Sequence, residues 1–158
     1  MTDAGGSPHD GRRLARAAAL QVLYECEVGR LTVDEALGVL DRVGPPEAAT
    51  LDPDARAFAE ALARGVGNHL ATLDERMAQA AQHWRVERMA TVDRLVMRLA
   101  VEEWLYHPAA PPRVVLSEAI DLARAYSGDE AARFVNGVLD GVLRQLKESG
   151  ALVDTQAR

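Results

Sequence analysis

Apolar side chains near the end of the chain recur three and four residues apart, and this spacing constrains the fold more than any other feature. The residues that follow it are Val135, Val138, Leu139, Val142 and Leu146. This spacing places them on one face of an α-helix and continues through Asn136-Gly137, a pair that could otherwise form a hairpin turn. Aromatic residues, which are enriched in strands, make up only 4% of the sequence. We therefore predict an all-α protein.

Prolines, glycines and capping residues divide the rest of the chain into further helices. Thr32 and Glu35 have the spacing of a capping box. Gly44, Pro45 and Pro46 cannot continue the helix that this box opens. We expect about six or seven helices in two small bundles. Their approximate ranges are 12–29, 32–43, 53–83, 91–107, 113–126 and 129–148.

Four glycines inside these ranges lead to specific predictions. Gly65 and Gly67 indicate a bend or a change of helix within residues 53–83. Gly137 and Gly141 lie four residues apart on one helix face. We expect both of them to let a neighbouring helix approach closely.

The chain divides into a leader, one helical domain and a tail. Residues 1–11 form a flexible leader, 12–148 a single domain and 149–158 the tail. Within the domain we expect an N-terminal sub-bundle over about 12–68 and a C-terminal one over about 69–148. The sequence has no apolar run of about 18 residues and no secretory signal, so we expect no membrane association and a cytoplasmic location.

No set of residues has the spacing of a catalytic or metal centre. The single cysteine, Cys26, excludes an internal disulfide framework and a cysteine-based zinc site. The four histidines lack metal-ligand spacing, and we expect them at the surface or at helix ends. Glu102 and Glu103 are adjacent, which separates them by about 100° on a helix, and we interpret them as part of a solvated face. We predict no enzyme, cofactor or metal.

Three arginines at the start of the first helix need an explanation. The chain has a net charge of −6, yet residues 12–23 hold Arg12, Arg13 and Arg16 and no acid. These arginines fall within an arc of about 100°, so their guanidinium groups can act together. The helix dipole opposes positive charge at this end. A polyanionic partner would account for the cluster, and a solvated helix start is the alternative.

Two later segments also combine arginine with features of single-stranded RNA binding. Arg113 follows two prolines in a loop, and Arg133 precedes Phe134 in the first turn of the last helix. An arginine for phosphate beside an aromatic ring for base stacking is a common arrangement for holding single strands. For Phe134, burial in the core is the alternative, and Trp84 and Tyr24 carry the same ambiguity between a packed and an exposed ring.

The chain resembles the NusB family of bacterial transcription antitermination factors. One matching segment is RRLARAAALQVLYECEVG, and the other is VDRLVMRLAVEEWLYHPAAPPRVVLSEAIDLARAYSGDEAARFVNGVLDGV. The resemblance covers nearly all of residues 12–146, and the FVNGVLD string is a specific part of it. It implies an all-helical fold of two bundles and no catalytic activity.

The resemblance also implies RNA as a ligand. Members bind the boxA element of nascent RNA with NusE, a ribosomal protein of the small subunit, and help RNA polymerase read through terminators in ribosomal RNA synthesis. By the same resemblance, the RNA-binding residues are Arg12, Arg13, Arg16, Arg113, Arg133 and Phe134. Leu14 replaces a third consecutive arginine and Pro112 an aromatic residue of some members, which weakens the expected patch.

Contacts with the ribosomal protein are implied at Tyr24 and Asp93. Asp93 is equally well explained as an acid favoured at a helix start. Glu130 matches an acidic position at the RNA-facing edge, where a carboxylate would repel phosphate and limit the affinity of the free protein.

Two other functions share this helical fold. One is a protein-interaction module without RNA affinity. The other is a detached domain of a ribosomal RNA methyltransferase, which the length of 158 residues and the lack of a glycine-rich cofactor loop disfavour. The sequence leaves open whether the protein is a monomer or a homodimer, and which other parts of the transcription elongation complex it contacts.

Overall fold

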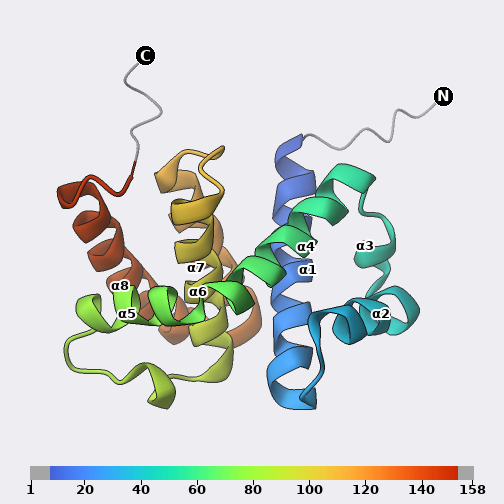
Figure 1. Cartoon of the computed structure of the whole chain (residues 1–158), viewed down its shortest axis with the longest axis horizontal. Helices are drawn as coiled ribbons and strands as arrows, with labels where there is room; N and C mark the ends of the chain where they lie inside the picture. Colours follow the sequence, from blue (N-terminus) through green and yellow to red (C-terminus); the bar gives the residue numbers. More distant parts are fainter. Residues whose placement is uncertain (1–7, 153–158) are drawn as a thin grey trace. The chain divides into compact units, whose positions relative to one another are not determined.

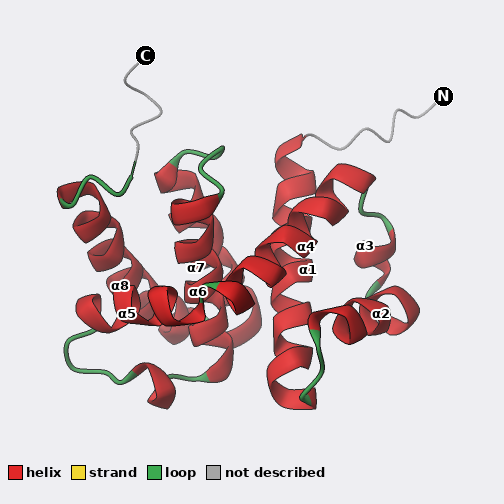
Figure 2. Cartoon of the chain, viewed as in Figure 1, coloured by secondary structure: helices red, strands yellow, loops and turns green. Residues whose placement is uncertain are grey.

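The computed structural model describes residues 8–152, and helices account for most of them (Figures 1 and 2). No strand occurs within that range. The helices are α1 (Pro8–Gly29), α2 (Val33–Val43), α3 (Pro46–Ala49), α4 (Pro53–Asn68), α5 (Leu70–Ala80), the 3-10 helix η1 (Val86–Arg88), α6 (Thr91–Tyr106), α7 (Pro112–Ser127) and α8 (Asp129–Glu148). The all-α prediction is confirmed. None of the helices in this range combines the length and the apolar character needed to span a bilayer.

The helices differ from the expected ones at several places. Helix α1 begins at Pro8, before the expected start near Arg12, so residues 8–11 of the expected leader are helical. The rest of that leader, residues 1–7, lies outside the described range, as do residues 153–158 of the expected tail. The one-turn helix α3 and the 3-10 helix η1 were not expected. The change of helix predicted near Gly65 and Gly67 comes slightly later, because α4 ends at Asn68 and α5 begins at Leu70.

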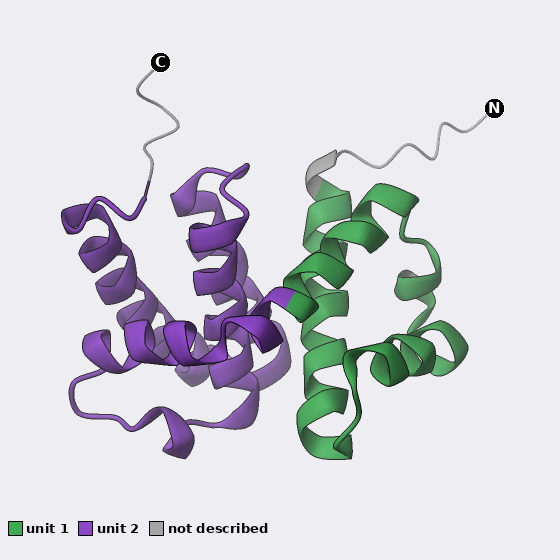
Figure 3. Ribbon diagram, in the orientation of Figure 1, with its two compact units in different colours: residues 1–64 green, residues 65–158 purple. Residues whose placement is uncertain are grey.

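Contacts divide the chain into two compact units (Figure 3). Unit 1 ends at Arg64 and unit 2 begins at Gly65. This division falls inside α4, a few residues before the sub-bundle boundary expected near residue 68.

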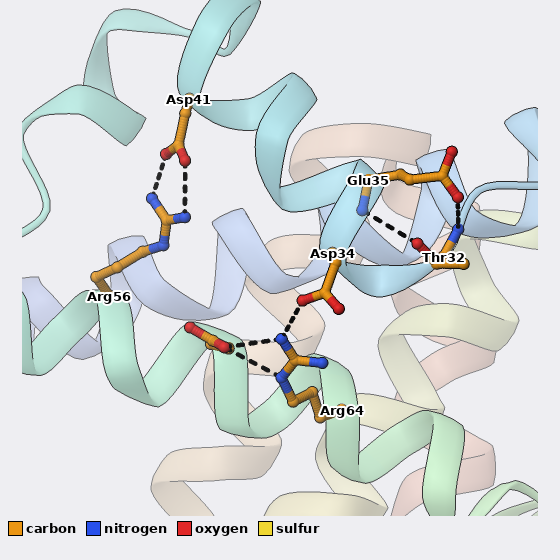
Figure 4. A network of polar contacts seen from close by, with 7 residues as sticks. Thr32, Asp34, Glu35, Asp41, Arg56 and Arg64 are labelled. Carbon is orange, nitrogen blue, oxygen red and sulfur yellow. Dashed lines mark hydrogen bonds and ion pairs between the residues drawn. The ribbon is translucent and has the colours of Figure 1, made fainter.

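Unit 1 contains α1, α2, α3 and most of α4. Its α2 begins with the predicted capping box, in which Thr32 Oγ1 accepts a 3.1 Å hydrogen bond from the Glu35 amide and Glu35 Oε1 accepts a 3.2 Å bond from the Thr32 amide (Figure 4). Two ion pairs, Arg56–Asp41 and Arg64–Asp34, connect α4 to α2. The hydrogen bond from Arg56 lowers the pKa of Asp41. The polar groups of this network lie at or near the surface.

Unit 2 is built from α5 to α8, with α6 in contact with each of α5, α7 and α8. Its core is large and aliphatic, and its fully buried side chains include Leu73, Met77, Met97, Leu139, Leu143 and Leu146. A Cβ atom added at Gly141 would lie 3.3 Å from the Cβ of Ala80, so Gly141 allows the close approach of α5 that was expected. The same expectation for Gly137 is wrong. That glycine is exposed and faces open space, because the close contact with α5 occurs at Gly141, one turn further along the helix.

The interpretation of Glu102 and Glu103 as a solvated face is also wrong, because the two side chains are 0% and 2% exposed. Since neighbours pack around α6, adjacent positions on this helix both face protein. The Glu102 carboxylate lies 2.9 Å from Nδ1 of His69 and 3.2 Å from Nε2 of His107, two histidines at helix ends. A Cβ atom on Gly65 would fall 1.8 Å from Glu102 Oε1, so the absence of a side chain at Gly65 makes room for the carboxylate.

Candidate nucleic-acid interface

The arginine cluster of α1 lies against a phenylalanine of α4. The guanidinium carbon of Arg12 is 4.4 Å from the centre of the Phe58 ring, and that of Arg16 is 5.9 Å from it. Arg13 is exposed, Arg12 is half-buried and Arg16 is only 7% exposed. The structure therefore brings Arg12 and Arg16 together over one ring. The alternative of a wholly solvated helix start is wrong for Arg16.

The Phe58 ring positions these cations without neutralising them. A guanidinium group that lies over an aromatic face gains a cation–π interaction and keeps its in-plane N–H donors for other acceptors. Nη1 of Arg12 is buried and has no hydrogen-bond partner among residues 8–152. A buried donor without an acceptor is costly, and a phosphate oxygen is a suitable acceptor. Sequence analysis missed Phe58, because only the packing of α1 with α4 reveals its role.

Arg113 and Arg133 lie far apart within unit 2. Arg113 is the second residue of α7 and Arg133 the fifth of α8. Because Gly128 alone separates these two packed helices, they run in opposite directions. Arg113 is 14 residues, or about 21 Å of helix, from the Ser127 end of α7 near which Arg133 lies. Both arginines are exposed, and neither forms an ion pair with another described residue.

Phe134 is half-buried, so its ring is partly packed and partly open to solvent. It meets Trp84 edge to face, with ring centroids 5.6 Å apart and planes at 76°. Trp84 is 61% exposed and Tyr24 is 42% exposed, so both rings lie at the surface instead of being packed inside. The pair of rings formed by Trp84 and Phe134 therefore presents aromatic surface, and the exposed Arg133 precedes Phe134 on α8.

Asp93 is a helix-start acid whose side chain is buried. It lies in the first turn of α6 and is only 8% exposed. Burial raises the pKa of its carboxyl, and a hydrogen bond from the Ser127 side chain opposes that shift. Its Oδ1 atom has no partner among the residues that the structure describes. A buried carboxylate with an unsatisfied oxygen destabilises the free protein, which is more typical of an interface residue than of a residue selected for stability.

We also compared the positions of histidine, cysteine and acidic side chains in residues 8–152 with the arrangement that a metal ion needs. No group of three or more histidine, cysteine or acidic side chains in this part of the chain is arranged to hold a metal ion. In unit 1 the candidate residues offer guanidinium donors, which suit an anionic group. In unit 2 they offer exposed arginines, aromatic rings and one buried carboxylate, which suits a hydrogen-bond donor.

Comparison with known proteins gives one consistent result. Residues 13–144 match the model of the NusB family. Transcription antitermination protein NusB of Sorangium cellulosum (strain So ce56) is 40% identical over 135 residues, which cover 85% of this chain and 93% of the relative. The structure of T. maritima NusB has a TM-score of 0.75 at 30% identity, with 89% of this chain and 97% of that chain covered. A structure of antitermination factors NusB and NusE in complex with dsRNA has a TM-score of 0.75 at 26% identity, covering 86% of this chain and 98% of that chain.

Proposed function

The chain belongs to the NusB family of transcription antitermination proteins, which are not enzymes, and we propose that it acts by binding boxA RNA together with the ribosomal protein NusE. In this proposal the complex joins the transcription elongation complex in the cytoplasm. There it promotes read-through by RNA polymerase in ribosomal RNA operons. The crystallised assembly of a related NusB with NusE and dsRNA supports both partners.

The observation that carries the RNA proposal is the position of Arg12 and Arg16 over the Phe58 ring, with Arg13 exposed on the same helix. Two guanidinium groups are held over one ring, and a third is exposed beside them. The ring orders these side chains before RNA arrives, which reduces the entropy lost on binding. Their charge is concentrated locally on a protein whose net charge is −6. Phosphate groups are therefore attracted to this part of unit 1.

In unit 2 we assign further RNA contacts to Arg133 and Phe134 and a separate one to Arg113. The exposed guanidinium of Arg133 is available for phosphate, and the ring of Phe134 lies beside it on α8. Since Arg113 lies near the opposite end of the α7–α8 pair, it cannot contact the same nucleotide. An RNA strand that reached all three residues would have to follow the length of these helices.

For NusE we assign Tyr24 and Asp93 as contacts. Tyr24 presents an exposed ring on α1, and aromatic side chains are enriched at protein interfaces. Asp93 has a carboxylate oxygen that no described residue satisfies. A donor from the partner would satisfy that oxygen, with a local shift of the surrounding side chains.

Binding of a boxA-containing single-stranded RNA tests the proposal against a scrambled RNA of the same length. Each RNA is titrated with and without NusE, at two salt concentrations. We expect selective binding of boxA RNA that NusE strengthens and that weakens as salt rises. Equal affinity for the two RNAs under every condition would contradict the proposal and leave a protein-interaction module.

A further inference from the structure

Trp84 is a large aromatic side chain that the fold leaves mostly uncovered. It lies between α5 and η1 and is 61% exposed. The other tryptophan, Trp104, is 3% exposed, and its Nε1 donates a 3.1 Å hydrogen bond to the carbonyl oxygen of Pro112. The chain thus buries and satisfies one indole ring while it presents the other to solvent. An exposed ring gives up most of the hydrophobic stabilisation that burial would supply.

An aromatic neighbour, Phe134, supports the exposed ring. Phe134 meets Trp84 edge to face at a centroid distance of 5.6 Å. Since an edge-to-face neighbour cannot cover both faces of an indole, and Trp84 is 61% exposed, ring surface stays open to a ligand. Phe134 is itself one of the residues assigned to RNA above. The open ring therefore extends that proposed interface from α8 to the segment before η1.

The charges around the ring favour a nucleic acid. Arg85 and Arg88 accompany Trp84, and Arg133 accompanies Phe134; all three are exposed and form no ion pair with any residue in the described range. The nearby acids on these segments are Glu87, Asp129 and Glu130. Since Asp129 is ion-paired with Arg124, the three unpaired arginines outnumber the two remaining acids. Exposed rings interleaved with unpaired arginines are typical of surfaces that bind single-stranded nucleic acid.

We propose that Trp84 is a stacking platform for one base of a single-stranded RNA, held in place by Phe134 and flanked by arginines that contact the neighbouring phosphates. This proposal rests on the proposed function, because it adds a base-stacking residue to the same RNA interface. A base stacked on an aromatic side chain contributes sequence-tolerant affinity, so Trp84 strengthens binding without selecting a particular base. Arg133 can then contact the backbone beside the stacked base.

The test compares Trp84→Ala, Trp84→Phe and the control Leu70→Ala in the full-length protein with NusE present. Leu70 is an exposed apolar side chain of the same unit, at 42% exposure, and no RNA role is assigned to it. The probe is a boxA-containing single-stranded RNA, titrated over a range of salt concentrations. We expect Trp84→Ala to lower RNA affinity by about 5- to 150-fold, Trp84→Phe to recover most of it, and Leu70→Ala to stay within twofold of wild type.

Two further readouts separate stacking from a general structural effect. Trp84→Ala should leave the slope of log affinity against log salt unchanged, whereas Arg133→Ala should reduce it by about 0.7. RNA should also quench the fluorescence of the wild type, and the quenching should disappear in Trp84→Phe even though that variant still binds.

The outcomes distinguish this inference from the function on which it rests. If wild type binds boxA RNA and Trp84→Ala binds it equally well, the stacking inference is overturned and the proposed function stands. If wild type binds no RNA, the proposed function fails, and the inference fails with it. If Trp84→Ala weakens NusE binding in the absence of RNA and leaves the RNA contribution unchanged, the ring is a protein contact and the inference is again overturned.

Discussion

Both units have carboxylates at the surface, but among the described residues only unit 2 also buries carboxylates. In unit 1, Asp34 and Asp41 meet arginines of α4 at the surface. In unit 2, Glu102 and Asp93 are buried, the first between two histidines and the second with one unsatisfied oxygen. A surface carboxylate contributes little to stability and tolerates removal, whereas a buried one depends on its partners. Buried charge in unit 2 therefore has either a structural role, as at Glu102, or an interface role, as we propose for Asp93.

The largest expected effect is the loss of stability when the buried carboxylate of Glu102 is removed. Glu102→Ala removes the carboxylate between His69 and His107 and leaves a cavity beside Gly65. We expect the free energy of unfolding to fall by about 3–5 kcal/mol. The matched change in unit 1, Asp34→Ala, removes an exposed partner of Arg64 and should cost less than about 1 kcal/mol. Chemical denaturation measures both, and equal losses would show that the two environments do not differ.

A smaller effect concerns the ring beneath the arginine cluster of unit 1. Phe58→Leu keeps apolar volume at this position and removes the aromatic face below Arg12 and Arg16. We expect RNA affinity to fall by about 5- to 30-fold, equivalent to about 1–2 kcal/mol, because the guanidinium groups lose their orientation. The salt dependence should persist, since no charge is removed. Titration of boxA RNA at several salt concentrations checks this, and full affinity in the variant would mean that the ring has no role in binding.

Asp93 and Asp41 should respond to pH with opposite signs. Burial raises the pKa of Asp93 above 3.8, so the folded state holds this proton more tightly than the unfolded state. Its ionisation therefore lowers stability as pH rises from 3.8 through the raised value. The hydrogen bond from Arg56 lowers the pKa of Asp41, so the stability that Asp41 contributes is present above 3.8 and is lost as pH falls through the lowered value.

The variant Asp93→Asn measures how much the ionisation of Asp93 affects stability. This variant cannot ionise, so we expect it to be more stable than wild type by about 1 kcal/mol at neutral pH and to show no advantage well below pH 3.8. Thermal melts across the acid range measure the difference. The same variant should bind NusE more weakly. If the variant's stability relative to wild type instead increased as pH fell, the assignment of Asp93 as a buried carboxylate with a raised pKa would be contradicted.

The smallest expected effect is the difference in stability between alanine substitutions at two glycines of α8. Gly137 faces open space, so Gly137→Ala should stabilise the protein by about 0.5–1 kcal/mol through helix propensity alone. At Gly141 the added methyl group would meet Ala80 at 3.3 Å, and that gain should be cancelled or reversed. Melting temperatures of the two variants provide the comparison. Equal stabilisation at both sites would show that α5 does not approach α8 closely.

Local patterns were sufficient to predict most of the helices. The apolar spacing of α8, the Thr32 capping box and the stop at Gly44 each depend on residues close together in the sequence. The burial of Glu102 depends instead on α6 having neighbours on several sides, which a pair of adjacent acids does not reveal. Likewise, a helix-start arginine cluster predicts positive charge, but only tertiary packing places Phe58 beneath Arg12. The sequence did not predict the environment of side chains that are packed by segments distant in the sequence.

The central claim is that the arginine cluster of α1 binds RNA phosphates, and the salt dependence of boxA RNA binding tests it most directly. The variant replaces Arg12, Arg13 and Arg16 by alanine, and the control replaces Arg42, Arg76 and Arg144, which changes the net charge equally. Both are titrated with boxA RNA in the presence of NusE. If each cluster arginine neutralises one phosphate, the log–log salt slope should fall by about 2 units in the variant and stay near wild type in the control. Equal slopes in wild type, variant and control would contradict the account.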